Sequence, residues 1–234
     1  IVQDQEGYFY FATNGGLSVF DGNSFHTYNY QNINSFSNSI TTLVALGDSI
    51  VLIGSRDKGL FLLDKTTDNI RPVFFYNVVL SNISSLELTK NNELWIGTPN
   101  QGLFYLSDCS FLSNPDNNEI KLSYVEYPFP AIYSMTSIGD HLFIASHSNV
   151  LFIVTRTKNT FSIENKLLDS NITSIYSLAS TADNDLWIGT NCGISILSNQ
   201  KDKGWSIDKK IALPTNPIRT ISLVGDVAYA AVEG

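Results

Sequence analysis

The sequence is poor in charged residues and nearly lacks cysteine. Charged residues make up 15% of its 234 residues, whereas 43% are hydrophobic, and this balance excludes an intrinsically disordered chain. No uninterrupted apolar run approaches the roughly 20 residues that a membrane-spanning helix needs, so we expect no membrane contact by this segment. The only cysteines, Cys109 and Cys192, stand far apart in the sequence pattern. We therefore expect two free thiols.

Basic residues are scarce as well. The chain has 14 lysines and arginines against 22 acidic residues, a net charge of -8, and such a charge disfavours nucleic acid as a partner. The three histidines, His26, His141 and His147, lack the spacing of a metal site. The sequence shows no nucleophile elbow, phosphate-binding loop or paired catalytic carboxylates. It therefore predicts no cofactor, no metal and no catalytic residue in this segment.

What the sequence does contain is a repeated strand phrase. Its clearest copies are Leu94–Thr98 and Leu186–Thr190, both reading Leu-Trp-Ile-Gly-Thr. Weaker copies occupy 9–13, 51–55, 142–146 and 228–232. The small residues at the fourth position of these copies stand 42 to 48 positions apart. A period in this range indicates propeller blades or solenoid turns.

Each repeat contains four short strand-like runs, which in the third repeat are 83–88, 94–98, 102–106 and 120–125. They are rich in β-branched and aromatic residues and are separated by Asn, Gly and Ser, as strands joined by hairpins are. No segment has a helical period. Four antiparallel strands in about 40 to 45 residues predict an all-β fold, a β-propeller of four-stranded antiparallel blades. A right-handed β-solenoid is the alternative, but its coils repeat at shorter intervals.

The repeats define the expected domain organisation. We expect a single propeller segment over 1–234, with repeats at 1–37, 38–80, 81–129, 130–169, 170–214 and 215–234. The sixth repeat holds only the first two strand-like runs. The segment is therefore expected to be an incomplete excerpt, about five blades plus half a sixth, of a larger ring.

The repeated phrase is expected to be structural. Trp95 and Trp187 should pack between blades, because aromatic side chains dominate cores. The glycine beside each should let strands approach closely at the hairpin. The structural blade motif comprises Trp95, Gly97, Gly102, Trp187, Gly189 and Gly193.

A leading Ile-x-x-Ile strand, a polar turn, Leu-Trp-Ile-Gly-Thr and then Gly-Leu together resemble the two-component-regulator propeller repeat. The resemblance covers almost the whole chain, although Leu52, Phe143 and Tyr229 stand where the pattern has Trp. It implies the periplasmic or otherwise extracytoplasmic sensor region of a bacterial hybrid two-component system, a class that often responds to carbohydrates. A histidine kinase could then be attached outside this chain or be absent altogether.

The turns that follow the motif strand differ between repeats and share one face of the expected propeller. Their amides and charges could bind sugar hydroxyls, and Arg56 suits an anionic group. The alternative explanations are left-handed turn geometry for Asn14 and Asn191, and a solvated turn for His147. Asp183 and Asp185 are likewise expected in a solvated turn. The candidate ligand-binding residues are Asn14, Arg56, Asp57, Lys58, Asn100, Gln101, His147 and Asn191.

The sequence therefore predicts a non-catalytic ligand-sensing propeller of a signal-transduction regulator. Its expected partners are a carbohydrate or other small polar ligand such as an oligosaccharide, neighbouring blades or sensor domains of the same protein, and a second copy in a homodimer. A protein-interaction scaffold is the alternative and predicts a broad exposed face instead of a pocket. A propeller lyase or hydrolase would need titratable groups clustered at the channel mouth.

Overall fold

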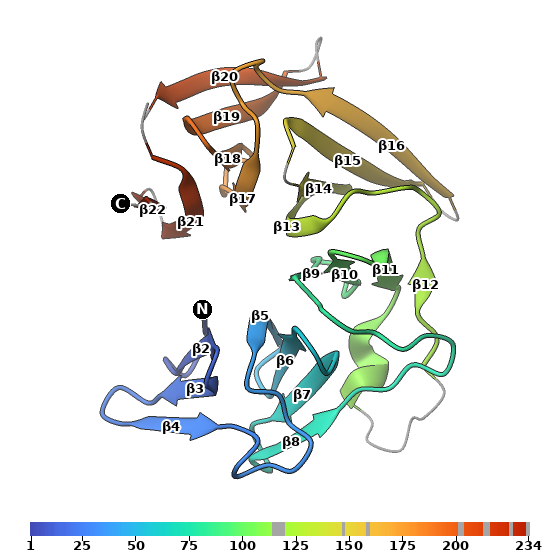
Figure 1. Cartoon of the computed structure of the whole chain (residues 1–234), viewed down its shortest axis with the longest axis vertical. Helices are drawn as coiled ribbons and strands as arrows, with labels where there is room; N and C mark the ends of the chain where they lie inside the picture. The colour runs from blue at the N-terminus through green and yellow to red at the C-terminus, as the bar shows by residue number, and fades with distance from the viewer. Residues whose placement is uncertain are drawn as a thin grey trace. The chain divides into compact units, whose positions relative to one another are not determined.

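The computed structural model describes residues 1–113, 120–146, 148–157, 160–200, 204–212, 216–224 and 227–232. Apart from one short 3-10 helix, Cys109–Ser113, the elements it describes are β-strands (Figure 1). None of these residues forms a helix long and apolar enough to cross a membrane. The chain divides into two compact units, Ile1–Phe129 and Pro130–Gly234, called unit 1 and unit 2 below.

In its described residues, unit 1 contains three four-stranded antiparallel sheets whose strands follow one another in chain order. The first sheet consists of β1 (Val2–Gln3), β2 (Phe9–Thr13), β3 (Gly16–Phe20) and β4 (Phe25–Tyr28). The second consists of β5 (Ile40–Leu46), β6 (Ile50–Ser55), β7 (Leu60–Asp64) and β8 (Asn69–Pro72). The third consists of β9 (Ser85–Leu88), β10 (Leu94–Thr98), β11 (Gly102–Leu106) and β12 (Ser123–Tyr124).

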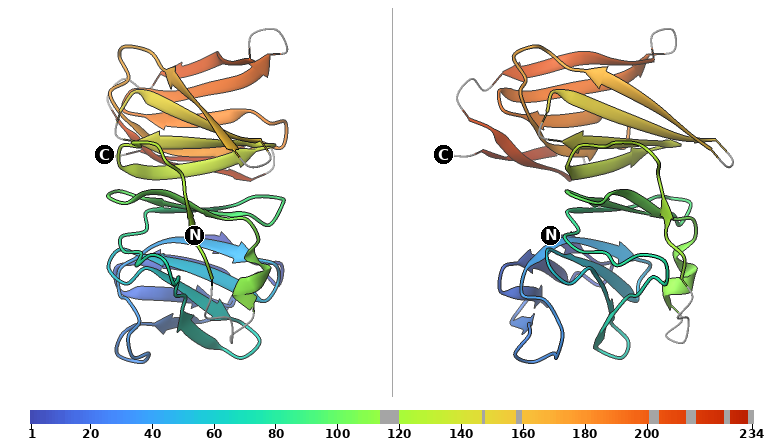
Figure 2. Two further views of the ribbon diagram at one scale, coloured as in Figure 1. Left: turned by 90° about the vertical axis from the view of Figure 1, so that its right-hand side faces the viewer. Right: turned by 45° about the vertical axis from the view of Figure 1, so that its right-hand side comes forward.

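Unit 2 follows the same plan, as both views in Figure 2 show. Its first sheet consists of β13 (Ile132–Ile138), β14 (His141–Ser146), β15 (Val150–Thr157) and β16 (Thr160–Leu167). The second consists of β17 (Ile175–Ser180), β18 (Leu186–Thr190), β19 (Gly193–Gln200) and β20 (Gly204–Ala212). β21 (Ile218–Val224) and β22 (Val227–Val232) form a two-stranded sheet.

The prediction of four-stranded antiparallel blades is thus confirmed, and each sheet falls within one expected repeat. The long spacing between the third and fourth motif copies has a visible cause. The connection from β11 to β12 carries the 3-10 helix, and β12 is only two residues long instead of the six expected at 120–125. The assignment of 1–234 to a single propeller segment stays a prediction.

The motif strands form the centre of each sheet. Every residue of β6 and of β10 is buried, and β6 is packed on both faces within unit 1. Trp95 is 2% exposed, as expected for a residue that packs between blades. Trp187 is only half-buried, although it too packs between two sheets. The sheet beside it has two strands, β21 and β22, and Trp187 packs at the margin of the small cluster formed by Ile194, Ile196, Ile218 and Ile221.

The motif glycine marks a close approach between successive sheets. A Cβ on Gly54 would lie 2.6 Å from Thr42 Cγ2 and 2.8 Å from Ile83 Cγ2, which enters the next sheet. In unit 2, a Cβ on Gly189 would lie 2.8 Å from the carbonyl oxygen of Ile218. We expected the glycine to serve the hairpin of its own strand. It serves instead the contact with the leading strand of its own sheet and with the sheet that follows.

A threonine hydroxyl joins the second sheet of unit 1 to the segment that enters the third sheet. Thr41 Oγ1 lies 3.0 Å from the carbonyl oxygen of Gly54 and also within hydrogen-bonding distance of the carbonyl oxygen of Ile83. Its short side chain reaches both because the glycine keeps the backbones close. This explains the small hydroxyl residue at position 41 of the leading strand β5.

Replacement of the motif glycine should therefore destabilise the fold. We expect Gly54→Ala to lower the free energy of unfolding by roughly 1–3 kcal/mol, because the added methyl group overpacks a buried contact. Urea denaturation measures this change. Gly15→Ala is the matched control, since its Cβ would meet only Thr13 Oγ1 at 3.6 Å. Equal stability of the two variants would contradict the explanation.

Candidate functional site

The turns of the predicted ligand face are closed by the last residue of the motif strand. In four blades this is a Thr or Ser whose hydroxyl donates to the carbonyl oxygen of the glycine three or four residues later. The pairs are Thr13–Gly16 (2.8 Å), Ser55–Gly59 (2.9 Å), Thr98–Gly102 (2.9 Å) and Thr190–Gly193 (2.8 Å). The same hydroxyl accepts a backbone N–H from within the turn. The turn backbone is thereby tied to the end of a buried strand.

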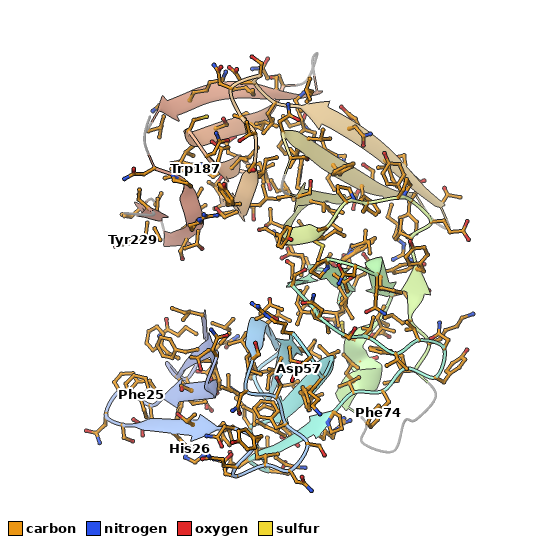
Figure 3. The ribbon with its side chains drawn as sticks, viewed as in Figure 1. Phe25, His26, Asp57, Phe74, Trp187 and Tyr229 are labelled. Carbon is orange, nitrogen blue, oxygen red and sulfur yellow. The ribbon has the colours of Figure 1, made fainter. Side chains whose placement is uncertain are left out.

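Within the turn after β6, the three predicted residues have different roles. The Asp57 carboxylate accepts a hydrogen bond from the hydroxyl of buried Ser37, in the segment that leads into β5 (Figure 3). The backbone N–H of Arg56 donates to the carbonyl oxygen of Ser39 at 2.9 Å. The residues Arg56 and Lys58 are exposed. This turn therefore presents two basic side chains from a backbone held in place by Asp57.

The turn after β10 uses Gln101 in the same way. Its Oε1 accepts the backbone N–H of Ser81 at 3.0 Å, and its Nε2 donates to the carbonyl oxygen of Val79 at 3.0 Å. Both ends of the amide are thus bonded to the segment that leads into β9. Asn100, beside it, is exposed.

Asn191 repeats this arrangement in the turn after β18. Its Oδ1 accepts the backbone N–H groups of Thr173 (2.8 Å) and Ser174 (3.2 Å), and its Nδ2 donates to the carbonyl oxygen of Asn171 (3.3 Å). Asp57, Gln101 and Asn191 therefore act as braces, each binding the segment that enters the first strand of its own blade. The sequence reasoning had considered them only as ligand contacts or turn formers.

Two further predicted residues, Asn14 and His147, are not among these braces. Asn14 is exposed in the turn between β2 and β3. The asparagines with positive φ in the described chain are Asn82, Asn92 and Asn184, so left-handed geometry explains neither Asn14 nor Asn191. His147 lies outside the described residues. In the part of the chain that is described, no hydrogen bond joins predicted residues from two different turns.

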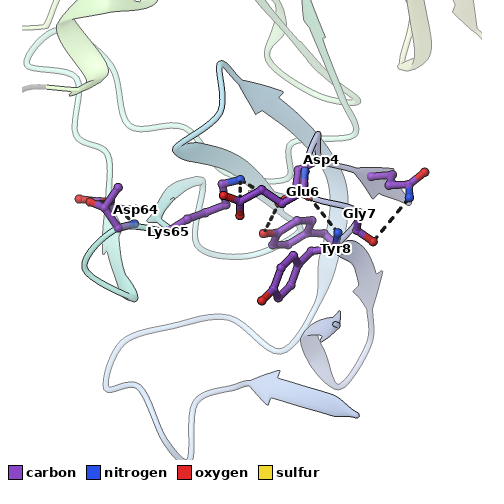
Figure 4. A network of polar contacts seen from close by, with 9 residues as sticks. Asp4, Glu6, Gly7, Tyr8, Asp64 and Lys65 are labelled. Carbon is purple, nitrogen blue, oxygen red and sulfur yellow. Dashed lines mark hydrogen bonds and ion pairs between the residues drawn. The ribbon is translucent and has the colours of Figure 1, made fainter. Parts of the chain in front are cut away.

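A polar cleft between the first two sheets was missed by the sequence analysis (Figure 4). Two of its lining residues, Tyr10 and Lys65, bind the carboxylate of Asp4, whose side chain is 2% exposed and lies 2.8 Å from Lys65 Nζ. The carboxylate also accepts the Tyr10 hydroxyl at 3.0 Å and the backbone N–H groups of Glu6 and Tyr8. The cleft has a volume of about 170 Å³ and is lined by Glu6, Tyr8, Tyr10, Val19, Tyr28, Leu63, Lys65 and Asp68.

The electrostatics of this cleft follow from its hydrogen bonds. Burial opposes ionisation of Asp4, but the hydrogen bonds from Lys65, Tyr10 and the Tyr8 backbone outweigh it, so the pKa of Asp4 lies below its ordinary value. Burial, reinforced by the hydrogen bond to Asp4, raises the pKa of Tyr10. At neutral pH Asp4 is therefore ionised and Tyr10 is a neutral phenol. Asp4 and Lys65 are 61 residues apart, and no local pattern pairs them.

The two cysteines are free, as predicted. Cys109 is buried, and burial, with a smaller effect of the Asp108 charge, raises the pKa of its thiol to about 12. Among the residues that the structure describes, no three His, Cys, Asp or Glu side chains come together as metal ligands.

The fold is thus that of a β-propeller segment built from four-stranded blades. Residues 167–192, around the fifth motif copy, match the family described as two component regulator propeller, which confirms the resemblance over that part of the chain. No curated protein matches the sequence.

Solved structures extend the similarity to the whole chain. One is the extracellular domain of BT4673 from B. thetaiotaomicron, described as a hybrid two component system, with 20% identity and a TM-score of 0.75 over 99% of this chain and 30% of that one. The extracellular domain of BT3049 from the same organism, also described as a hybrid two component system, has 19% identity and a TM-score of 0.75 over 100% of this chain and 32% of that one. PorZ, a surface component of the type-IX secretion system of Porphyromonas gingivalis, has 13% identity and a TM-score of 0.69 over 93% of this chain and 35% of that one. The chain thus spans about a third of the length of these proteins.

The brace assigned to Gln101 can be tested against its neighbour. We expect Gln101→Ala to speed hydrogen exchange of the Ser81 amide about tenfold, because the variant removes its acceptor. Asn100→Ala should leave this rate unchanged, since Asn100 is exposed. Exchange measured by NMR distinguishes the two. An unchanged Ser81 rate in Gln101→Ala would rule out the brace.

The ion pair of Asp4 should contribute to stability in a pH-dependent way. We expect Asp4→Asn to lower the free energy of unfolding by about 3 kcal/mol near neutral pH, because it leaves Lys65 without its buried partner. The folded-state pKa is depressed, so this contribution is complete above the unfolded value of about 3.9 and is lost as the pH falls through the folded value. Denaturant titrations of both proteins from neutral pH downward should converge in acid. A difference that is independent of pH would contradict this assignment.

Proposed function

We propose that the chain is an extracytoplasmic, non-catalytic sensor segment of a bacterial signalling regulator, which recognises a carbohydrate or another small polar ligand. The observation that carries the proposal is the similarity over 99% of the chain to the extracellular domain of a protein described as a hybrid two component system. The match of residues 167–192 to the two component regulator propeller family supports it independently.

Within this function, the turn face of unit 1 is the proposed binding surface. The hydroxyl closures and the braces hold the turn backbones before any ligand arrives, so little conformational entropy is lost on binding. On this rigid support Arg56 and Lys58 are exposed. A guanidinium can bind a carboxylate or a pair of hydroxyl groups with two parallel hydrogen bonds.

An aromatic surface lies beside the basic side chains. Lys58 lines a hollow of about 110 Å³ together with Phe74, Val79 and other apolar residues. Phe74 is 72% exposed (Figure 3). A flat aromatic ring next to charged donors can accept the apolar face of a sugar ring while the donors bind its oxygens. An oligosaccharide that contains uronic acid combines these two features.

The braces suggest how binding could reach the rest of the segment. Asp57 and Gln101 connect the turns to the segments that lead into β5 and β9. A ligand that binds the braced arrangement of these turns more tightly than an unbraced one increases its population, and β5 and β9 are held with it. This mechanism requires no covalent chemistry. The use of predicted site residues as backbone braces supports a non-catalytic role.

A protein-interaction scaffold is the second candidate. The connection from β8 to β9 exposes Phe74, Tyr76 and Val79 by 72%, 62% and 86%. Exposed apolar side chains this close in sequence are a feature of protein-binding surfaces. A scaffold role predicts tight binding of a protein and no response to saccharides.

The proposed function is tested by calorimetric titration of the chain with neutral and uronic acid-containing oligosaccharides. We expect Arg56→Ala to weaken binding of an acidic oligosaccharide about tenfold, because it removes the bidentate contact. Lys90→Ala is the matched control, as it removes an exposed positive charge from the turn at the opposite end of the third blade. If no oligosaccharide binds, or if both variants bind like the parent protein, the turn-face proposal is wrong.

A further inference from the structure

The cleft between the first two sheets of unit 1 has no role in the proposed function. Glu6 and Tyr8 contribute to its lining from the turn between β1 and β2, and Lys65 and Asp68 contribute from the turn between β7 and β8. These two turns are at the opposite ends of β2 and β7 from the turns of the predicted ligand face. The cleft is therefore a separate place in the fold. The lining residues used below all belong to the unbroken described stretch 1–113.

Lys65 supplies a hydrogen-bond donor that is fixed in position. Its Nζ lies 2.8 Å from Oδ2 of Asp4, and its side chain is 12% exposed. An ammonium group has three N–H donors, and Asp4 accepts one of them. Glu6 Oε2, at 4.0 Å, is too far away to accept another. The lining of the cleft thus includes a cationic donor that can bind a ligand oxygen while it stays paired with Asp4.

Two carboxylates supply acceptors in the same lining. The Glu6 side chain is 70% exposed, and the Glu6 backbone is fixed because its N–H donates to Asp4 Oδ1 at 3.0 Å. Asp68 is exposed and accepts the hydroxyl of Tyr28. A carboxylate has about four acceptor positions. Both Glu6 and Asp68 therefore retain acceptors for a ligand.

Tyr8 adds an aromatic ring to the lining, and Figure 4 shows it together with Glu6 and Lys65. Tyr8 is 39% exposed. Its backbone is bonded twice to Asp4: the Tyr8 N–H donates to Asp4 Oδ1 at 2.9 Å, and the Tyr8 carbonyl oxygen accepts the Asp4 N–H at 3.0 Å. One buried residue thus orients a ring, a donor and an acceptor before any ligand binds. Little conformational entropy is then lost on binding.

The lining selects a neutral ligand that carries hydroxyl groups. An anion is repelled by Glu6 and Asp68, and a cation is repelled by the ammonium group of Lys65. A hydroxyl group both donates and accepts, so one polyol can bind carboxylates and an ammonium group together. The cleft volume of about 170 Å³ is smaller than the roughly 300–1,000 Å³ of sites for drug-sized molecules, and it therefore suits one ring rather than a chain.

We propose that this cleft is a second ligand site, which binds a single neutral sugar ring. Glu6 and Asp68 accept hydrogen bonds from two of its hydroxyl groups, and Lys65 donates to the oxygen of a third. The ring of Tyr8 packs against the apolar face of the sugar. The bound ring touches turns of two successive sheets, so it stabilises their packing. The site goes beyond the proposed function, does not depend on it, and takes one neutral ring where the turn face takes an acidic chain.

The test is an NMR titration of the whole chain with the methyl glycosides of glucose, galactose and mannose. We expect at least one of them to bind and to shift the amide signals of Glu6 and Tyr8. The uronic acid and the amino sugar related to that glycoside should bind at least tenfold more weakly, because each adds a charge that the lining repels.

A disaccharide of the same sugar separates two sources of the ring. Binding as tight as that of the methyl glycoside identifies the end of a chain as a ligand, and absence of binding identifies the free sugar. Binding more than tenfold tighter would contradict a site for one ring.

Variants locate the site. We expect Tyr8→Ala to weaken binding of the glycoside about tenfold and Glu6→Gln about fivefold, because they remove the ring and a charged acceptor. Glu6 is 70% exposed, so its variant should fold like the parent protein. Tyr30→Ala and Glu126→Gln are the matched controls, since both residues are exposed in unit 1 and are not among the described lining residues of the cleft. Both controls should bind like the parent protein.

Several results would overturn the proposal. If none of the three glycosides binds, or if both cleft variants bind like the parent protein, the cleft is not a sugar site. Equal binding of glucuronic acid or of spermidine would show a site for charged ligands. If Arg56→Ala weakens binding of the glycoside while Tyr8→Ala does not, the ligand occupies the turn face. In that case the second site is wrong and the proposed function stands.

Discussion

The close approach of successive sheets at the motif glycine is the constraint on which the rest of this structure depends. At Gly54 and at Gly189, a single added methyl group would collide with the leading strand of the same sheet and with the residue that enters the next one. This contact brings the Thr41 hydroxyl within reach of carbonyl groups in two sheets. The motif strand β6 becomes buried on both faces as a result. Little freedom remains in the motif itself, so the variable part of each repeat is found in its turns.

The turns are held in place by hydrogen bonds to the last residue of the same motif strands. The Thr or Ser that ends the motif strand closes the turn on the following glycine, and Asp57, Gln101 or Asn191 bonds the turn to the segment that enters the blade. A repeated framework thus presents unlike side chains. The side chains of the turns can therefore change without a change in packing.

Much of the fold could be predicted from the sequence. The strands, their hairpins and their grouping in fours follow from local periodicity, and the structure reproduces them from β1 to β20. The roles of individual turn residues were harder to predict. An amide in a polar turn has the same local sequence whether it faces a ligand or bonds backward, so Gln101 and Asn191 could not be recognised as braces. The hydroxyl closure did leave a signal, since Thr13, Ser55, Thr98 and Thr190 end their copies of the motif.

The sequence by itself determined the repeat, the blade and the identity of the residues that build it, because these depend on contacts between neighbouring strands of one hairpin. Only the tertiary structure decided which polar groups meet between blades. Asp4 pairs with Lys65. The turn that holds Asp140 lines the same cavity as the turn that holds Asp183 and Asp185. These partners are more than 40 residues apart. Their contacts depend on how one sheet stacks on the next, and side-chain packing fixes that stacking, which no local pattern records.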